Sequence, residues 1–340
     1  MARPTHCRLS LRESTPSRGF TLIELLVVVV VIGALVMLLL PAVQQAREMA
    51  RKTQCENNLG QLIIAVNHYE ATHGVYPPGT IDATGPVLNA RLGYHHNWIV
   101  QSLPFLELHN EWAAVDKDQN IYHARNGAIR AHNLRMLLCP SEPAGAPMTS
   151  YSACHHDTES SIDAQDNGVF FLNSRLRYRD IKDGTSCTIF LGEKIIDTWD
   201  MEWCSGTRGS LRNTGSTINK LTERNGGLTG GVPGSPYDGT VVPPALGFDP
   251  LGVPGLESGK PAAEPSSTIQ GIKSPQVGTG QPVVASLGSP SFVGGFGSAH
   301  HGGAVFALGD GSIRYLNQTI DAAVYQQLGH RTDGKLPPSF

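Results

Sequence analysis

Three residues near the C-terminus are of types that could do chemistry: His300, His301 and Asp310. A histidine beside a carboxylate can begin a metal site or supply a general base. A hairpin turn at residues 309–311 could bring His300 near Asp310. In the alternative interpretation, Asp310 and Gly311 form the turn and the histidine hydrogen-bonds a loop or strand edge. We favour this structural role.

A second polar cluster combines histidines with acids: His155, His156, Asp157, Glu159, Asp163 and Asp166. Carboxylates suit a divalent cation, but the spacing of these aspartates fits no compact calcium loop. We therefore interpret the cluster as a solvated acidic loop. We expect no cofactor, with calcium or another divalent cation as the alternative. Glu193 and Lys194 follow a predicted strand, and we interpret them as a partly buried ion pair.

Five cysteines follow the first apolar run, and none forms a CxxC pair: Cys55, Cys139, Cys154, Cys187 and Cys204. A zinc ribbon requires such pairs, so the spacing does not indicate one. Location favours a disulfide between Cys55, on the inward face of one predicted helix, and Cys139, at the end of another. An exported protein permits this bond. Buried unpaired thiols are the alternative.

The chain lacks the HExxH, GxSxG, P-loop and EF-hand patterns, so it is not predicted to be an enzyme. Its formal net charge is −3, and it has no large cluster of Lys and Arg. Such clusters neutralise phosphates, so nucleic acid is not an expected partner. Gly (38) and Pro (23) are abundant, which predicts a loop-rich body rather than a helical bundle.

Residues 20–40 form an apolar run that contains one charge, Glu24. At about 1.5 Å per residue this run spans roughly 30 Å, the thickness of a bilayer core. Arginines before the run favour a cytoplasmic N-terminus, although basic residues also follow it. An acid inside lipid is costly, so Glu24 predicts a functional partner. A plain signal anchor is the alternative.

The sequence RGFTLIE, residues 18–24, closely resembles the type IV prepilin signal. In that family a prepilin peptidase cleaves after the glycine, the new terminus is N-methylated, and the acid neutralises the terminus of a neighbouring subunit. The resemblance implies cleavage after Gly19, methylation of Phe20 and an assembly role for Glu24. It also implies a single-pass protein of the bacterial inner membrane, with a cytoplasmic N-terminus and a head in the periplasm or otherwise outside the membrane.

The elements divide into a leader (1–19), a transmembrane helix (20–40), an amphipathic stem helix (41–74) and an exported head (75–340). The stem is predicted by apolar residues spaced by three and four, and Gly74 ends it. Within the head we predict helices at 92–140, one of them over 124–138, and a last helix capped by Thr319. We predict strands at 168–171, 188–191, 304–308 and 312–316, and long loops at 206–291. The predicted fold class is α+β, a long helix packed on a head with an antiparallel sheet.

A second resemblance covers nearly the whole chain. It rests on the segments CENNLGQLIIAVNHYEATHGVYPPG, LLCPSEP, DIKDGTSCTIFLGEK and HHGGAVFALGDGSIRYLNQTID. Together they are similar to the bacterial family called domain of unknown function 1559, whose members often begin with a prepilin-type motif. That family has a C-terminal pattern of His, nine residues, then Asp-Gly, which His300, Asp310 and Gly311 match. The resemblance implies architecture and leaves activity open.

Three functions follow from these features. The first is a pilin-like or pseudopilin-like assembly subunit whose partners are prepilin peptidase, the inner membrane and other pilin-like subunits. The second is a membrane-tethered module that binds a glycan, peptide or envelope component. The third and least favoured is a metal-dependent hydrolase centred on His300 and Asp310.

Overall fold

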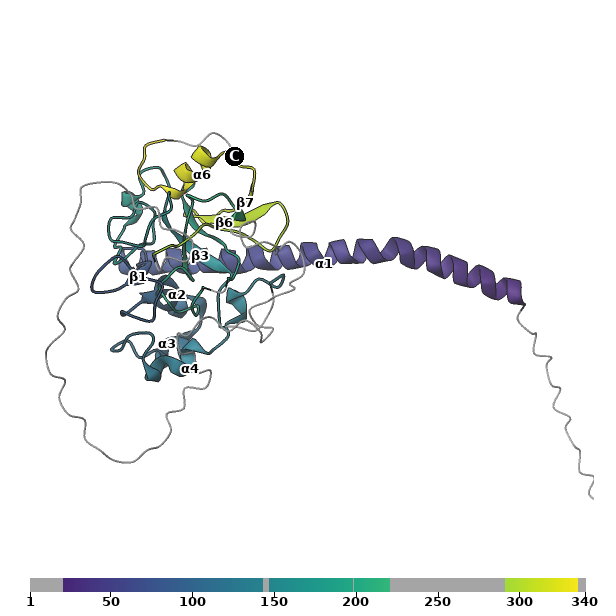
Figure 1. The fold of residues 1–340 in the computed structure, drawn as a ribbon, viewed down its shortest axis with the longest axis horizontal. Coiled ribbons are helices and arrows are strands. Elements are labelled where there is room, and N and C mark those ends of the chain that lie inside the picture. Colours follow the sequence, from purple (N-terminus) through teal and green to yellow (C-terminus); the bar gives the residue numbers. More distant parts are fainter. Residues whose placement is uncertain (1–20, 143–146, 198, 221–290, 336–340) are drawn as a thin grey trace, which may run out of the picture. The chain divides into compact units, whose positions relative to one another are not determined.

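The computed structural model describes residues 21–142, 147–197, 199–220 and 291–335. The chain divides into two compact units, Met1–Ala50 and Arg51–Phe340. One helix, α1 (Leu22–His73), runs through the end of the first unit into the second (Figure 1). The stem helix predicted up to residue 74 is therefore confirmed as part of one continuous helix.

The end of α1 follows from its sequence. Gly74 adopts a left-handed backbone with φ +72°, which side-chain-bearing residues rarely adopt.

The predicted apolar stripe of α1 is buried at Cys55, Leu59, Leu62 and Val66. The second half of α1 is thus a core element of the larger unit.

The larger unit is built on a five-stranded sheet of order β5-β3-β4-β6-β7. Three of its pairings are antiparallel, and the β3–β5 pairing is parallel. The α+β class is confirmed, with a mixed rather than purely antiparallel sheet. A separate two-stranded sheet joins β1 (Thr80–Ile81) to β2 (His96–Asn97). The strands of the large sheet are β3 (Tyr151–His156), β4 (Ile189–Glu193), β5 (Leu211–Asn213), β6 (Gly303–Leu308) and β7 (Ile313–Asn317).

Both faces of this sheet are covered, which explains the unbroken apolar run of β6. Val305 and Ala307 pack in the same cluster as the stem residues Leu59 and Val66. The alternate residues of β6 point to the opposite face, where α6 (Ala322–Gly329) packs. A strand that is buried on both faces has an almost continuous run of apolar residues in its sequence.

The helical segment before the sheet is more broken than predicted. It contains α2 (Trp98–Ser102), η1 (Leu103–Leu106), α3 (His109–Ala114), η2 (Ala124–Asn126), α4 (Gly127–Arg130) and η3 (Arg135–Leu137). The single helix predicted over 124–138 is therefore wrong. One reason is Asn126, whose buried side chain bonds the backbone of Asp116 and Asn120. Such side-chain bonds compete with a continuous helix.

The strand predicted at 168–171 is also wrong. The N–H groups of Gly168, Val169 and Phe170 all donate to the carbonyls of His155 and Cys154. A ladder strand would spread its bonds along a neighbour, and β3 is already paired on both sides. Residues 168–170 therefore form a tight connection with Phe170 in the core.

The C-terminal hairpin and the strand at 188–191 are confirmed by β6, β7 and β4. The last helix is also present, but its cap differs. Asp321 accepts hydrogen bonds from the backbone of Ala323 and Val324, whereas Thr319 bonds Asn317. Of the predicted loop region 206–291, residues 221–290 lie outside the described part of the chain.

Candidate functional site

Of the predicted processing residues, Gly19 and Phe20 lie outside the described part of the chain, and Glu24 lies in the first turn of α1. The Thr21 N–H and hydroxyl both donate to Oε2 of Glu24, at 2.9 and 2.7 Å. The Glu24 N–H in turn approaches Oγ1 of Thr21 at 3.3 Å. This reciprocal pair is a capping box, which the T-x-x-E spacing could have indicated. It fixes the carboxylate at the N-terminal end of the helix.

The structure places His300 and Asp310 at opposite ends of β6, with the six-residue strand between them. At about 3.3 Å per residue that strand alone separates them by roughly 20 Å. The spacing of the His-x9-Asp-Gly pattern is therefore the length of a strand and its turn. The hypothesis that these two side chains form one catalytic or metal site is wrong.

Asp310 and Gly311 build the hairpin turn. The N–H of Gly311 donates to the carbonyl of Leu308 at 3.0 Å, and Gly311 has φ +89°. Oδ1 of Asp310 accepts from both the N–H and the hydroxyl of Ser312. This is the three-residue loop that ends in a left-handed residue, where glycine is favoured. The half of the motif at the turn thus specifies the register of β6 and β7.

His300 instead lies beside the sulfur atoms of Cys55 and Cys139. These two cysteines form a disulfide that joins α1 to the segment after η3, with 5.3 Å between their Cα atoms. Nε2 of His300 lies 3.4 Å from Sγ of Cys139 and 3.8 Å from Oε1 of Glu193. All four residues are buried.

The two carboxylate oxygens of Glu193 have different surroundings. Oε2 accepts the N–H of Val305 at 2.9 Å, which ties β4 to β6. Oε1 faces His300 and has no hydrogen-bond partner among the described residues. Burial raises the pKa of Glu193. No local sequence signal could have found this residue, because its neighbours come from three distant segments.

The expected ion pair between Glu193 and Lys194 is wrong, because the two charged groups have different partners. Lys194 instead binds Asp200, which also accepts from Arg212 at 2.9 Å. Burial alone would raise the pKa of Asp200, but these cations hold it below its usual range. The charges belong to an internal network that fastens the end of β4 to β5.

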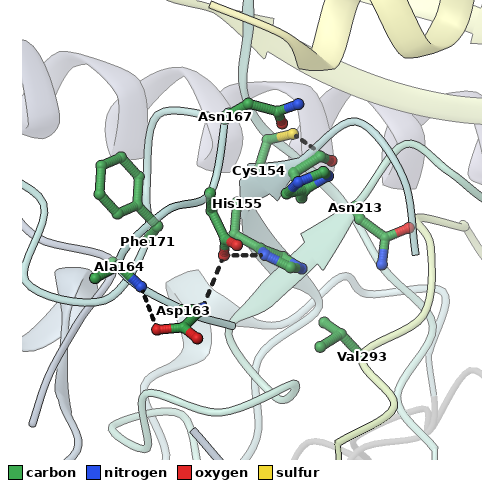
Figure 2. A network of polar contacts seen from close by, with 12 residues as sticks. Cys154, His155, Asp163, Ala164, Asn167, Phe171, Asn213 and Val293 are labelled. Carbon is green, nitrogen blue, oxygen red and sulfur yellow. Dashed lines mark hydrogen bonds and ion pairs between the residues drawn. The ribbon is translucent and has the colours of Figure 1, made fainter. Parts of the chain in front are cut away.

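The cluster around His155 is not a solvated loop. His155 is a fully buried residue of β3, and its Nδ1 lies 2.7 Å from Oδ2 of Asp166. Oδ2 of Asp166 also accepts the N–H of Asp163. Figure 2 shows Asp163 within this network of polar contacts. Nε2 of His155 has no hydrogen-bond partner in the described part of the chain. The sequence of β3 has no regular alternation of apolar and polar residues, so it does not indicate a strand.

Glu159 has a structural role in the same region. Its carboxylate accepts the N–H groups of Val293 and Gly294 and the side-chain amide of Asn213. Figure 2 labels Asn213 and Val293 in the same close-up as His155, and Asn213 pairs with His156 of β3. The Glu159 carboxylate thus holds together the loops around β5.

The described residues contain one helix long and apolar enough to cross a membrane, Leu22–His73. A model of the prokaryotic N-terminal methylation motif matches residues 15–40. The chain is therefore a prepilin-like protein anchored by its N-terminal helix. No curated protein and no solved structure shows significant similarity to it. A second family model matches residues 44–323, so the chain belongs to the family described as protein of unknown function (DUF1559).

Proposed function

We propose that the protein is a pilin-like or pseudopilin-like subunit of the bacterial inner membrane. Prepilin peptidase removes residues 1–19, Phe20 becomes the methylated terminus, and the exported head lies outside the cytoplasm. The observation that carries the proposal is the methylation motif at residues 15–40 on a continuous apolar helix. Both assembly and anchoring use that helix.

The capping box supports an assembly role for Glu24. Both contacts from Thr21 go to Oε2, so Oε1 can accept an ammonium group from a neighbouring subunit. A carboxylate and an ammonium each cost several kcal/mol in lipid, and pairing them offsets most of that cost. The capping contact also orients the carboxylate toward the helix terminus.

The first test is mass spectrometry of the intact protein and its N-terminal peptide from the native membrane. We expect a mature chain that begins at methylated Phe20. A chain that still begins at Met1 would contradict the processing and leave an uncleaved anchor.

The second test compares Glu24→Gln with Glu56→Gln, the same chemical change further along α1. Cross-linking in native membranes, followed by identification of the linked peptides, measures contacts with other pilin-like subunits. We expect Glu24→Gln to reduce these cross-links by about 10-fold or more, because the neighbouring ammonium loses its partner. Equal cross-linking in both variants would exclude Glu24 from assembly.

A further inference from the structure

One group of side chains in the described part of the chain has the composition of a metal site: Cys55, Cys139, Glu193 and His300. Their sulfur, nitrogen and oxygen atoms all lie within 4.8 Å of one another. The group is separate from the processing motif and from the hairpin turn at Asp310. Neither of those features explains why a histidine and a glutamate meet beside two cysteines.

The distances around His300 are close to those of ligands that share one ion. Zinc–sulfur bonds of about 2.3 Å and zinc–nitrogen or zinc–oxygen bonds of about 2.0–2.1 Å give tetrahedral edges of about 3.3–3.8 Å. Nε2 of His300 lies 3.4 Å from Sγ of Cys139 and 3.8 Å from Oε1 of Glu193. The S–N separation is close to its expected edge of about 3.5 Å, and the N–O separation exceeds its edge of about 3.3 Å by roughly 0.5 Å, so a small movement of the Glu193 carboxylate would bring both groups onto one ion.

Oε1 of Glu193 is a second, independent indication of a ligand. The side chain is 2% exposed, and this oxygen has no hydrogen-bond partner among the described residues. Buried carboxylate oxygens are normally satisfied by hydrogen bonds or by coordination to a metal. This oxygen lies within 4.8 Å of the other three donor atoms.

We propose that Cys55, Cys139, Glu193 and His300 form a zinc site when the two cysteines are reduced. Two thiolates, an imidazole and a carboxylate suit Zn²⁺ and not the hard cations Ca²⁺ and Mg²⁺, which prefer oxygen ligands. The disulfide and the zinc site are alternative states, because the same two sulfur atoms cannot be bonded to each other and bind zinc as thiolates. The disulfide must open so that its sulfurs separate to about 3.8 Å.

The site has a structural role. It offers four protein ligands and is closed to solvent, whereas catalytic zinc keeps a position for water or substrate. Its ligands come from α1, from the segment after η3, from β4 and from the segment before β6. Zinc would therefore fasten the stem to the sheet in the reduced chain, as the disulfide does in the oxidised chain.

The test uses the full-length chain in detergent, reduced with a phosphine. Reduction breaks the S–S bond and gives two thiols, while the phosphine becomes its oxide and water supplies the oxygen atom and both protons. Metal binding then releases the two thiol protons. The readouts are zinc content after removal of excess metal and the absorption spectrum with Co²⁺, which shows sulfur-to-metal charge transfer and intense tetrahedral bands when thiolates bind.

The informative variants are Glu193→Gln and His300→Ala. Their matched controls are Cys187→Ser, a cysteine outside the group, and His301→Ala, the exposed neighbouring histidine. Removal of a residue that only orients a ligand weakens metal binding about 10- to 100-fold, so loss of a ligand should cost at least about 100-fold. Mapping the Cys55–Cys139 disulfide in each oxidised variant checks that it folds.

The proposal predicts one zinc per reduced chain, none in the oxidised chain, and a tetrahedral thiolate spectrum with Co²⁺. It also predicts loss of affinity in both informative variants and none in the controls. Absence of stoichiometric zinc in the reduced wild type would overturn it. So would a cobalt spectrum without thiolate bands, or equal affinity in His300→Ala and His301→Ala.

Discussion

At the scale of single residues, Glu142 is a carboxylate whose pKa is shifted toward neutral pH. It accepts the hydroxyl of Ser150 and, at 3.1 Å, the N–H of Ile196. Ser150 Oγ in turn accepts the N–H of Cys139, so the chain of bonds reaches the disulfide. Burial raises the pKa of Glu142 to about 7, despite opposing hydrogen bonds and the charge of Lys194.

The raised pKa of Glu142 predicts a pH-dependent free energy of unfolding. Between the unfolded value of 4.5 and the folded value of about 7, the folded chain keeps a proton that the unfolded chain releases. Stability therefore falls as the pH rises through 7, by at most about 3 kcal/mol. Denaturant unfolding of the full-length chain at pH 5 and pH 8 measures this change.

Glu142→Gln should remove most of that pH dependence, because glutamine does not titrate and can still accept the N–H of Ile196 while its amide N–H donates to Oγ of Ser150. Glu107→Gln, at an exposed position, is the control and should keep the wild-type slope. An unchanged slope in Glu142→Gln would assign the effect to another group.

At the scale of elements, the β6–β7 hairpin depends on one backbone conformation. A methyl group added at Gly311 would meet no atom within 4 Å, but the residue has φ +89°. Gly311→Ala should therefore cost about 1–2 kcal/mol through conformation alone. Gly127→Ala also meets no atom, and its φ is −58°, so it should be neutral or stabilising. Thermal unfolding of both variants makes the comparison, and equal melting temperatures would contradict it.

Helix α6 offers a second comparison at this scale. Asp321 caps its first turn with two hydrogen bonds, so Asp321→Ala should destabilise the protein by about 1 kcal/mol. Thr319→Ala removes a hydroxyl that bonds Asn317 and should cost less. Chemical denaturation distinguishes the two caps. A larger loss in Thr319→Ala would show that the helix begins earlier.

At the scale of the larger unit, the disulfide between Cys55 and Cys139 closes a long segment. The two residues are 84 positions apart, so the bond removes much conformational freedom from the unfolded chain. A Cys55→Ala/Cys139→Ala double variant should lose about 3–5 kcal/mol of stability in the presence of a chelator. Cys187→Ala, which removes an unpaired thiol, is the control. Equal stability of the two would show that the bond does not form.

The sequence by itself determined the N-terminal anchor, the long helix, the hairpin and the family, because these depend on local periodicity, turn residues and contiguous motifs. Gly74, Gly311 and the apolar run of β6 are examples in which neighbours in sequence fix the structure. Only the tertiary structure decided that His300 faces Glu193 and not Asp310. That contact depends on how α1, β4 and β6 pack together. Packing between distant segments produces no periodic pattern of residues within any one of them.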